Sequence, residues 1–113
     1  MATRAQVKTF LDTFLAHWAK NWELIPRREN LATIMEHGLS FKRVHETIME
    51  LTISDYVSGP STDHTFKHHH VWVFGLELDG NEIYVKLFDD FTGGTARCIS
   101  FHKAGGKMVY PYR

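Results

Sequence analysis

Apolar residues recur at helical spacing near the start of the chain. The i, i+3, i+4, i+7 spacing places them on one face of an α-helix. The stripe consists of Val7, Phe10, Leu11, Phe14, Leu15 and Trp18. We therefore expect an amphipathic helix that packs this stripe against the core.

Two shorter helices are expected next. Asn30 is a candidate N-cap for a helix that stops at Gly38, and Ser40 is a candidate N-cap for the following one. Their apolar positions are Leu31, Ile34, Met35, Phe41, Val44, Ile48 and Met49. Residues 22–26 end at a proline, which predicts an extended connector or an edge strand.

The hydrophobic period changes to two after residues 56–63, a segment dense in turn formers. Residues 71–78, 83–88 and 96–102 are rich in β-branched and aromatic side chains, with turn sequences between them. They predict an antiparallel meander. Helices first and strands second predict an α+β fold in one domain of residues 1–113, helical over about 5–51 and a sheet over about 70–103. The N-terminal helices should pack on one face of a three- to four-stranded antiparallel sheet.

Side-chain alternation sorts the three runs into two faces. The helix-facing side should hold Trp72, Phe74, Leu76, Leu78, Ile83, Val85, Leu87, Ile99 and Phe101, given a two-residue turn near Gly80. The other side should hold Val71, Val73, Gly75, Glu77, Tyr84, Lys86, Ser100 and His102. His69 joins the second side if its strand extends back, whereas parity places Arg97 on the side opposite His102.

Charge and composition limit the functions that this chain can have. The 113 residues carry 13 basic and 13 acidic side chains, so any anion binding must be local. No acidic residue follows Asp90, whereas Arg97, Lys103, Lys107 and Arg113 do, so the C-terminal part is locally basic. The single cysteine, Cys98, excludes an internal disulfide, and the N-terminus lacks the apolar run of a signal peptide. We expect a cytoplasmic protein.

Three segments resemble the MqsR family of bacterial toxins: Leu51–Tyr56, Ile83–Leu87 and Ile99–Lys103. Members of that family are similar to RelE-type ribonucleases, small α+β domains that cut single-stranded messenger RNA without a metal. The resemblance implies a RelE-like fold, no cofactor, no membrane association, and a cognate antitoxin of the zinc-finger or helix-turn-helix type as partner.

The resemblance also assigns residues. Tyr84 and Lys86 match a Tyr-x-Lys strand whose tyrosine belongs to the active site. His102 stands where better-known members have a functional lysine, and Ser58 stands where they have another. His68 falls at the position of a catalytic glutamine.

Metal-free RNA cleavage uses the substrate's 2′-hydroxyl as nucleophile, so the protein must supply a base, an acid and positive charge. His102 suits either proton-transfer role because imidazole titrates near neutrality. Lys86 or Arg97 would stabilise the phosphate charge, and His68 or His69 would complete the acid–base pair. Tyr84 would orient the phosphate or stack on a base.

Residues expected to contact RNA around these groups are Ser58, Arg97, Ser100, Lys103 and Lys107. Two other functions fit the sequence. One is a non-catalytic protein-interaction module of the same fold, and the other is a metal-dependent hydrolase built on His64, His68 and His70.

Overall fold

A computed structural model describes residues 1–63, 69–90 and 93–113. Its helices are α1 (Arg4–Trp18), α2 (Arg28–Glu36), α3 (Phe41–Met49) and the short 3₁₀ helix η1 (Ile53–Asp55). Its strands are β1 (Trp22–Leu24), β2 (Tyr56–Thr62), β3 (His70–Leu78), β4 (Asn81–Asp90) and β5 (Thr95–Lys103). The expected α+β class is confirmed.

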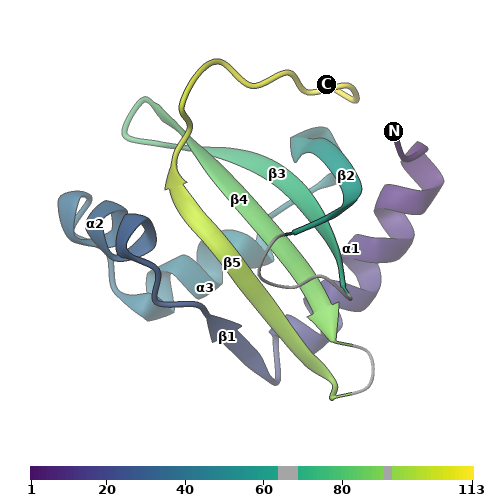
Figure 1. The fold of residues 1–113 in the computed structure, drawn as a ribbon, viewed down its shortest axis with the longest axis horizontal. Coiled ribbons are helices and arrows are strands. Elements are labelled where there is room, and N and C mark those ends of the chain that lie inside the picture. The colour runs from purple at the N-terminus through teal and green to yellow at the C-terminus, as the bar shows by residue number, and fades with distance from the viewer. Residues whose placement is uncertain (64–68, 91–92) are drawn as a thin grey trace.

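The sheet has five strands in the order β1-β5-β4-β3-β2, and it is mixed (Figure 1). Strands β2 to β5 are antiparallel, whereas β1 pairs parallel with β5. The expectation of a three- to four-stranded, wholly antiparallel sheet is therefore wrong. Both additional strands lie at the edges, and β2 contains Gly59-Pro60, which an edge strand tolerates more readily than a central one. Residues 56–62, expected as a loop, are this strand.

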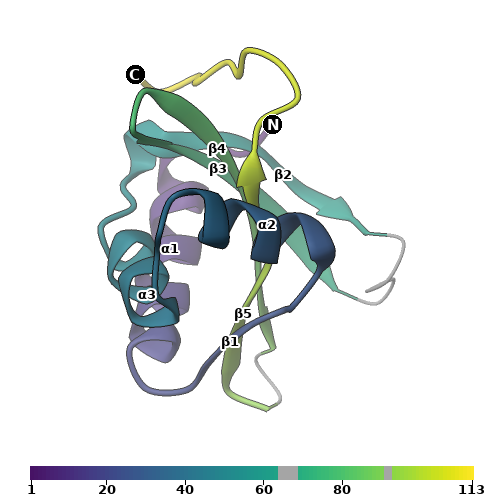
Figure 2. The same ribbon diagram turned by 90° about the vertical axis from the view of Figure 1, so that its left-hand side faces the viewer.

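Helices α1 and α3 cover one face of the sheet, and α2 crosses beside β5 (Figures 1 and 2). The core between the helices and the sheet includes Phe14, Trp18, Phe74, Val85, Leu87 and Phe101. We call the opposite face, which carries Tyr84 and Lys86, the open face. The predicted division of β3 and β4 into two faces is confirmed, because Trp72, Phe74 and Leu76 pair with Leu87, Val85 and Ile83.

Local chemistry explains the element ends. Ser40 accepts a hydrogen bond from the Arg43 amide and caps α3, as predicted. Gly38, with a φ of 61°, follows the end of α2. Asp79 and Gly80 both have positive φ and form the tight turn between β3 and β4.

Asn30 is not a helix cap, contrary to the sequence prediction. It lies inside α2 with no exposed surface. Its Nδ2 donates to the carbonyl oxygens of Ile25 and Ile99, both at 2.8 Å, and its Oδ1 accepts from the Phe101 amide at 2.8 Å. The side-chain amide thus takes the place of a neighbouring strand along β5, just beyond the segment that β1 covers.

A β-bulge lies at the same point of β5. Lys86 pairs with Ser100 but its neighbour Leu87 pairs with Cys98, so Ile99 is the extra residue. The bulge reverses the alternation before it. Cys98 therefore belongs to the helix-side core, whereas Ile99 packs with Val71 and Phe88 on the open face, and the face predicted for Ile99 is wrong.

We predict that Asn30→Ala destabilises the fold by about 3 kcal/mol, because it leaves buried backbone groups of β5 without partners. Urea unfolding would measure the change. The exposed neighbour Arg28→Ala is the control and should change stability by less than about 0.5 kcal/mol. Equal stability of the two variants would contradict this role of Asn30.

Candidate functional site on the open face

The open face brings together the three residues on which the sequence hypothesis rests. Tyr84 pairs directly with His102, and Lys86 pairs with Ser100. The rings of Tyr84 and His102 stack at 5.3 Å and 18°. The Lys86 ammonium lies 5.8 Å from the centre of the Tyr84 ring. Tyr84, Lys86 and His102 therefore form one cluster away from α1 and α3.

The surroundings of His102 favour one tautomer. Its Nδ1 lies 2.9 Å from the carbonyl oxygen of Lys103. A carbonyl oxygen only accepts, so Nδ1 carries the proton and donates, which leaves Nε2 of the neutral ring with a lone pair. Nε2 is thus the atom of His102 equipped to accept a proton from a substrate.

Lys86 forms an ion pair with Asp63, the residue that follows β2. Its Nζ lies 3.0 Å from Oδ1 of Asp63, and Arg27 lies 3.7 Å from Oδ2 of the same carboxylate. Arg27 precedes α2, which starts beside the open face (Figure 2). The Asp63 side chain is only 7% exposed. Two cations from different parts of the chain thus converge on one anion at this face.

Two of the predicted RNA contacts, Ser58 and Ser100, lie in the same cross-strand row as Lys86. Ser58, Val73, Lys86 and Ser100 are aligned across four strands by the sheet register. Ser100 is buried and Ser58 is exposed.

Lys103 does not join the cluster. Its ammonium binds Glu36 at the end of α2, and this contact lowers the pKa of the Glu36 carboxyl. Lys107 is exposed in the C-terminal segment.

Arg97 lies on the open face, so the prediction that it opposes His102 is wrong. The bulge at Ile99 shifts the alternation and pairs Arg97 with Phe88. The Arg97 guanidinium lies 5.5 Å from the centre of the Phe88 ring. His69 stacks on the same ring at 4.8 Å and 18°, so His69 also belongs to this face.

His68 and His64 lie outside the described residues, so the assignment of His68 and the metal reading stay predictions. Among residues 1–63, 69–90 and 93–113, no group of three or more His, Cys, Asp or Glu side chains converges as a metal site would require. Cys98 is buried, and burial raises the pKa of its thiol.

The C-terminal segment covers one end of the open face. A side chain at Gly75 would clash with Tyr110 and Met108, because the Tyr110 hydroxyl lies where its Cβ would stand. That hydroxyl donates to Glu82 at 2.8 Å. Gly75 pairs with Tyr84, so the covered end borders the cluster.

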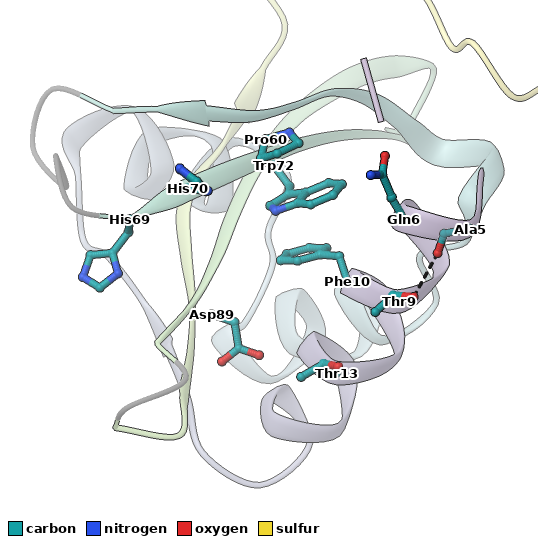
Figure 3. Close-up of a pocket in the computed structure, with 10 residues that line it drawn as sticks. All are labelled: Ala5, Gln6, Thr9, Phe10, Thr13, Pro60, His69, His70, Trp72 and Asp89. Atoms are coloured by element: carbon teal, nitrogen blue, oxygen red, sulfur yellow. Dashed lines mark hydrogen bonds between the residues drawn. The ribbon is translucent and has the colours of Figure 1, made fainter. Parts of the chain in front are cut away.

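A cavity of about 710 Å³ lies apart from this cluster, between α1 and the strands β2 and β3 (Figure 3). Phe10 and Trp72 stack at its centre, with ring centroids 4.5 Å apart. Asp89 also lines it and accepts from His17 at 2.8 Å. His69 and His70 line the outer part of the cavity. Its central walls are aromatic, and Asp89 contributes a carboxylate, so the cavity suits a phosphodiester less well than the open face with Lys86 does.

Sequence reasoning missed Asp63, Arg27 and Phe88 as parts of the site. Each depends on tertiary placement: Asp63 and Arg27 meet Lys86 from distant segments, and Phe88 appears as ordinary strand core. The basic pair Arg27-Arg28 before a helix was the available signal, but it does not identify its partner.

Comparison with known proteins adds no assignment. No protein-family model matches the chain, and no curated protein matches it. None of the helices in the described ranges is long and apolar enough to cross a membrane.

We predict that the Tyr110 phenol titrates late. Partial burial, followed by the hydrogen bond to Glu82, raises its pKa to about 12. Because the folded-state pKa lies above the ordinary value of about 10, this contribution to stability is complete below pH 10 and is lost as the pH rises through 12. The ultraviolet titration difference between the wild type and Tyr110→Phe should have its midpoint near 12.

Glu82→Gln should move that midpoint down, because it removes the carboxylate beside the phenol. A midpoint near 10 in the wild type would mean that the C-terminal segment does not rest on the open face.

Proposed function

We propose that this protein is a metal-independent endoribonuclease that cuts single-stranded messenger RNA, the toxin of a toxin–antitoxin pair of the MqsR and RelE-like kind. The observation that carries the proposal is the joint placement of Tyr84, Lys86 and His102 on the open face of the sheet. The α+β fold, with helices on one side of an antiparallel strand series, agrees with a RelE-like architecture.

In the proposed reaction, Nε2 of His102 takes the proton of the RNA 2′-hydroxyl. The 2′-oxygen forms a bond to phosphorus, and the bond between phosphorus and the 5′-oxygen breaks. The products are a 2′,3′-cyclic phosphate and a 5′-hydroxyl end. The Nδ1 contact with the Lys103 carbonyl favours the tautomer whose basic nitrogen is Nε2.

Lys86 supplies positive charge to the phosphate oxygens and gives a proton to the departing 5′-oxygen, and solvent then restores the protonation states of Lys86 and His102. Tyr84 lies between these two groups and orients the phosphate through its hydroxyl. His69 stacks flat on Phe88, which suits contact with a base better than transfer of a proton.

The cognate antitoxin, of zinc-finger or helix-turn-helix type, would silence this activity in a cytoplasmic setting. A protein-binding module remains the second candidate. It is favoured by the position of β2 at the edge of the sheet, since an edge strand is a template for pairing with another chain.

We predict that His102→Ala lowers the rate of RNA cleavage in EDTA by a factor of about 100, the usual contribution of a general base. Analysis of product ends should find 5′-hydroxyls with the wild type. His70→Ala is the matched control, because His70 is an exposed histidine that pairs with Thr62 outside the cluster. Full activity of His102→Ala would remove His102 from the mechanism.

The same variants separate the two candidate functions in cells. The wild type and His70→Ala should arrest bacterial growth, and His102→Ala should not. Unimpaired growth with well-expressed wild-type protein would favour the binding module.

We also predict that Asp63→Asn strengthens RNA binding. The change removes a carboxylate that competes with phosphate for Lys86 and Arg27. In a His102→Ala background, affinity for single-stranded RNA should rise about fivefold, or about 1 kcal/mol. The slope of log affinity against log salt should steepen by about 0.7 for each added phosphate contact.

Asp12→Asn is the control for this experiment, because Asp12 pairs with Lys8 on the exposed surface of α1. It should leave both the affinity and the salt slope unchanged. Weaker binding by Asp63→Asn would mean that Asp63 positions Lys86 rather than competing with RNA.

A further inference from the structure

Phe88, on the open face, contacts two polar side chains, His69 and Arg97. Its ring is 1% exposed although it is on the side away from α1 and α3. The His69 imidazole stacks on it at 4.8 Å and 18°, and the Arg97 guanidinium lies 5.5 Å from the ring centre. We call His69, Phe88 and Arg97 the Phe88 platform.

The platform is held in place from two sides. Nε of Arg97 donates to Glu23 of the edge strand β1 at 2.9 Å, and the Arg97 side chain is still 25% exposed. Phe88 packs with Val71 and Ile99, and Ile99 is the bulged residue that turns Arg97 to this face. Side chains that are already held in place lose little entropy when a ligand covers them.

The platform lies close to the proposed point of cleavage. Lys86 and Phe88 are same-face neighbours on β4, about 7 Å apart at the usual strand rise, and Tyr84 is about 13 Å from Phe88. Neighbouring bases of a stacked strand are only about 3.4 Å apart. Two successive bases therefore cannot rest on Tyr84 and on the platform while they remain stacked on each other.

We infer that the Phe88 platform is a subsite for one nucleobase next to the scissile linkage, and that the substrate is single-stranded RNA splayed open at that linkage. This inference rests on the proposed ribonuclease function. Imidazole and guanidinium planes are common stacking partners for unpaired bases, and such stacking is tolerant of sequence. Splaying also agrees with the chemistry, because the 2′-oxygen and the departing 5′-oxygen must align across the phosphorus.

The test uses dinucleotide substrates with one cleavable linkage. One has both bases, and two others lack either the 5′ or the 3′ base. For the complete dinucleotide, His69→Ala should raise KM by about tenfold and leave kcat unchanged. His69→Phe keeps a flat ring and should restore KM. Arg97→Lys keeps the charge but not the plane, and it should raise KM as well.

The base-deleted substrates identify the contact. One of them should be cleaved equally well by the wild type and by His69→Ala, because the base that His69 contacts is already absent. A lower kcat with unchanged KM in His69→Ala, or an equal loss on all three substrates, would overturn the subsite.

A binding measurement distinguishes failure of this inference from failure of the proposed function. The affinity of the wild type for a 2′-deoxy dinucleotide, which lacks the nucleophile, is compared with that of His69→Ala. Absence of cleavage of any RNA by the wild type would overturn the ribonuclease proposal. Unchanged affinity in His69→Ala would overturn the subsite even if cleavage is normal.

Discussion

The open face depends on how the outer edge of β5 is satisfied. Strand β1 pairs with only three residues of that edge, and the buried Asn30 amide then binds Ile99 and Phe101. The same carbonyl of Ile99 belongs to the bulge that shifts the alternation of β5. Because a bulge costs ladder hydrogen bonds, an internal partner at that place stabilises it. One side chain of α2 therefore fixes which residues of β5 share a face with Tyr84 and Lys86.

This dependence explains where sequence reasoning succeeds. Tyr84, Lys86, Ser100 and His102 obey simple alternation, because β4 is regular across Lys86 and the bulge precedes Ser100. Arg97 lies before the bulge, so its predicted face is reversed. Asn30 has the composition of a helix cap, and nothing in the local sequence reveals that its amide serves a strand about 70 residues away.

The cations of the candidate site are paired with carboxylates, in line with the zero net charge of the chain. Lys86 and Arg27 share Asp63, and Arg97 binds Glu23. A neutral chain has little long-range attraction for RNA, so binding in the proposed site is an exchange of carboxylate for phosphate at close range. The zero net charge is therefore only weak evidence against an RNA substrate. Affinity depends instead on whether the cations bind phosphate more strongly than they bind their carboxylate partners.

The two ends of the open face differ in the side chains they carry and in how far they are covered. At the end next to the turn, Glu77 and Glu82 pair directly across β3 and β4, and Tyr110 covers this end by donating to Glu82. At the other end lie Lys86 and Arg97. Like charges opposite each other destabilise a sheet unless a partner offsets them, and the Tyr110 hydroxyl supplies one hydrogen bond. Arg113 also lies at the covered end, 3.6 Å from the centre of the Tyr110 ring, so each end of the face holds carboxylates and at least one cation. The difference between the ends is therefore one of access: Tyr110 covers the end at Glu82, and the proposed cleavage point at Lys86 lies beyond it.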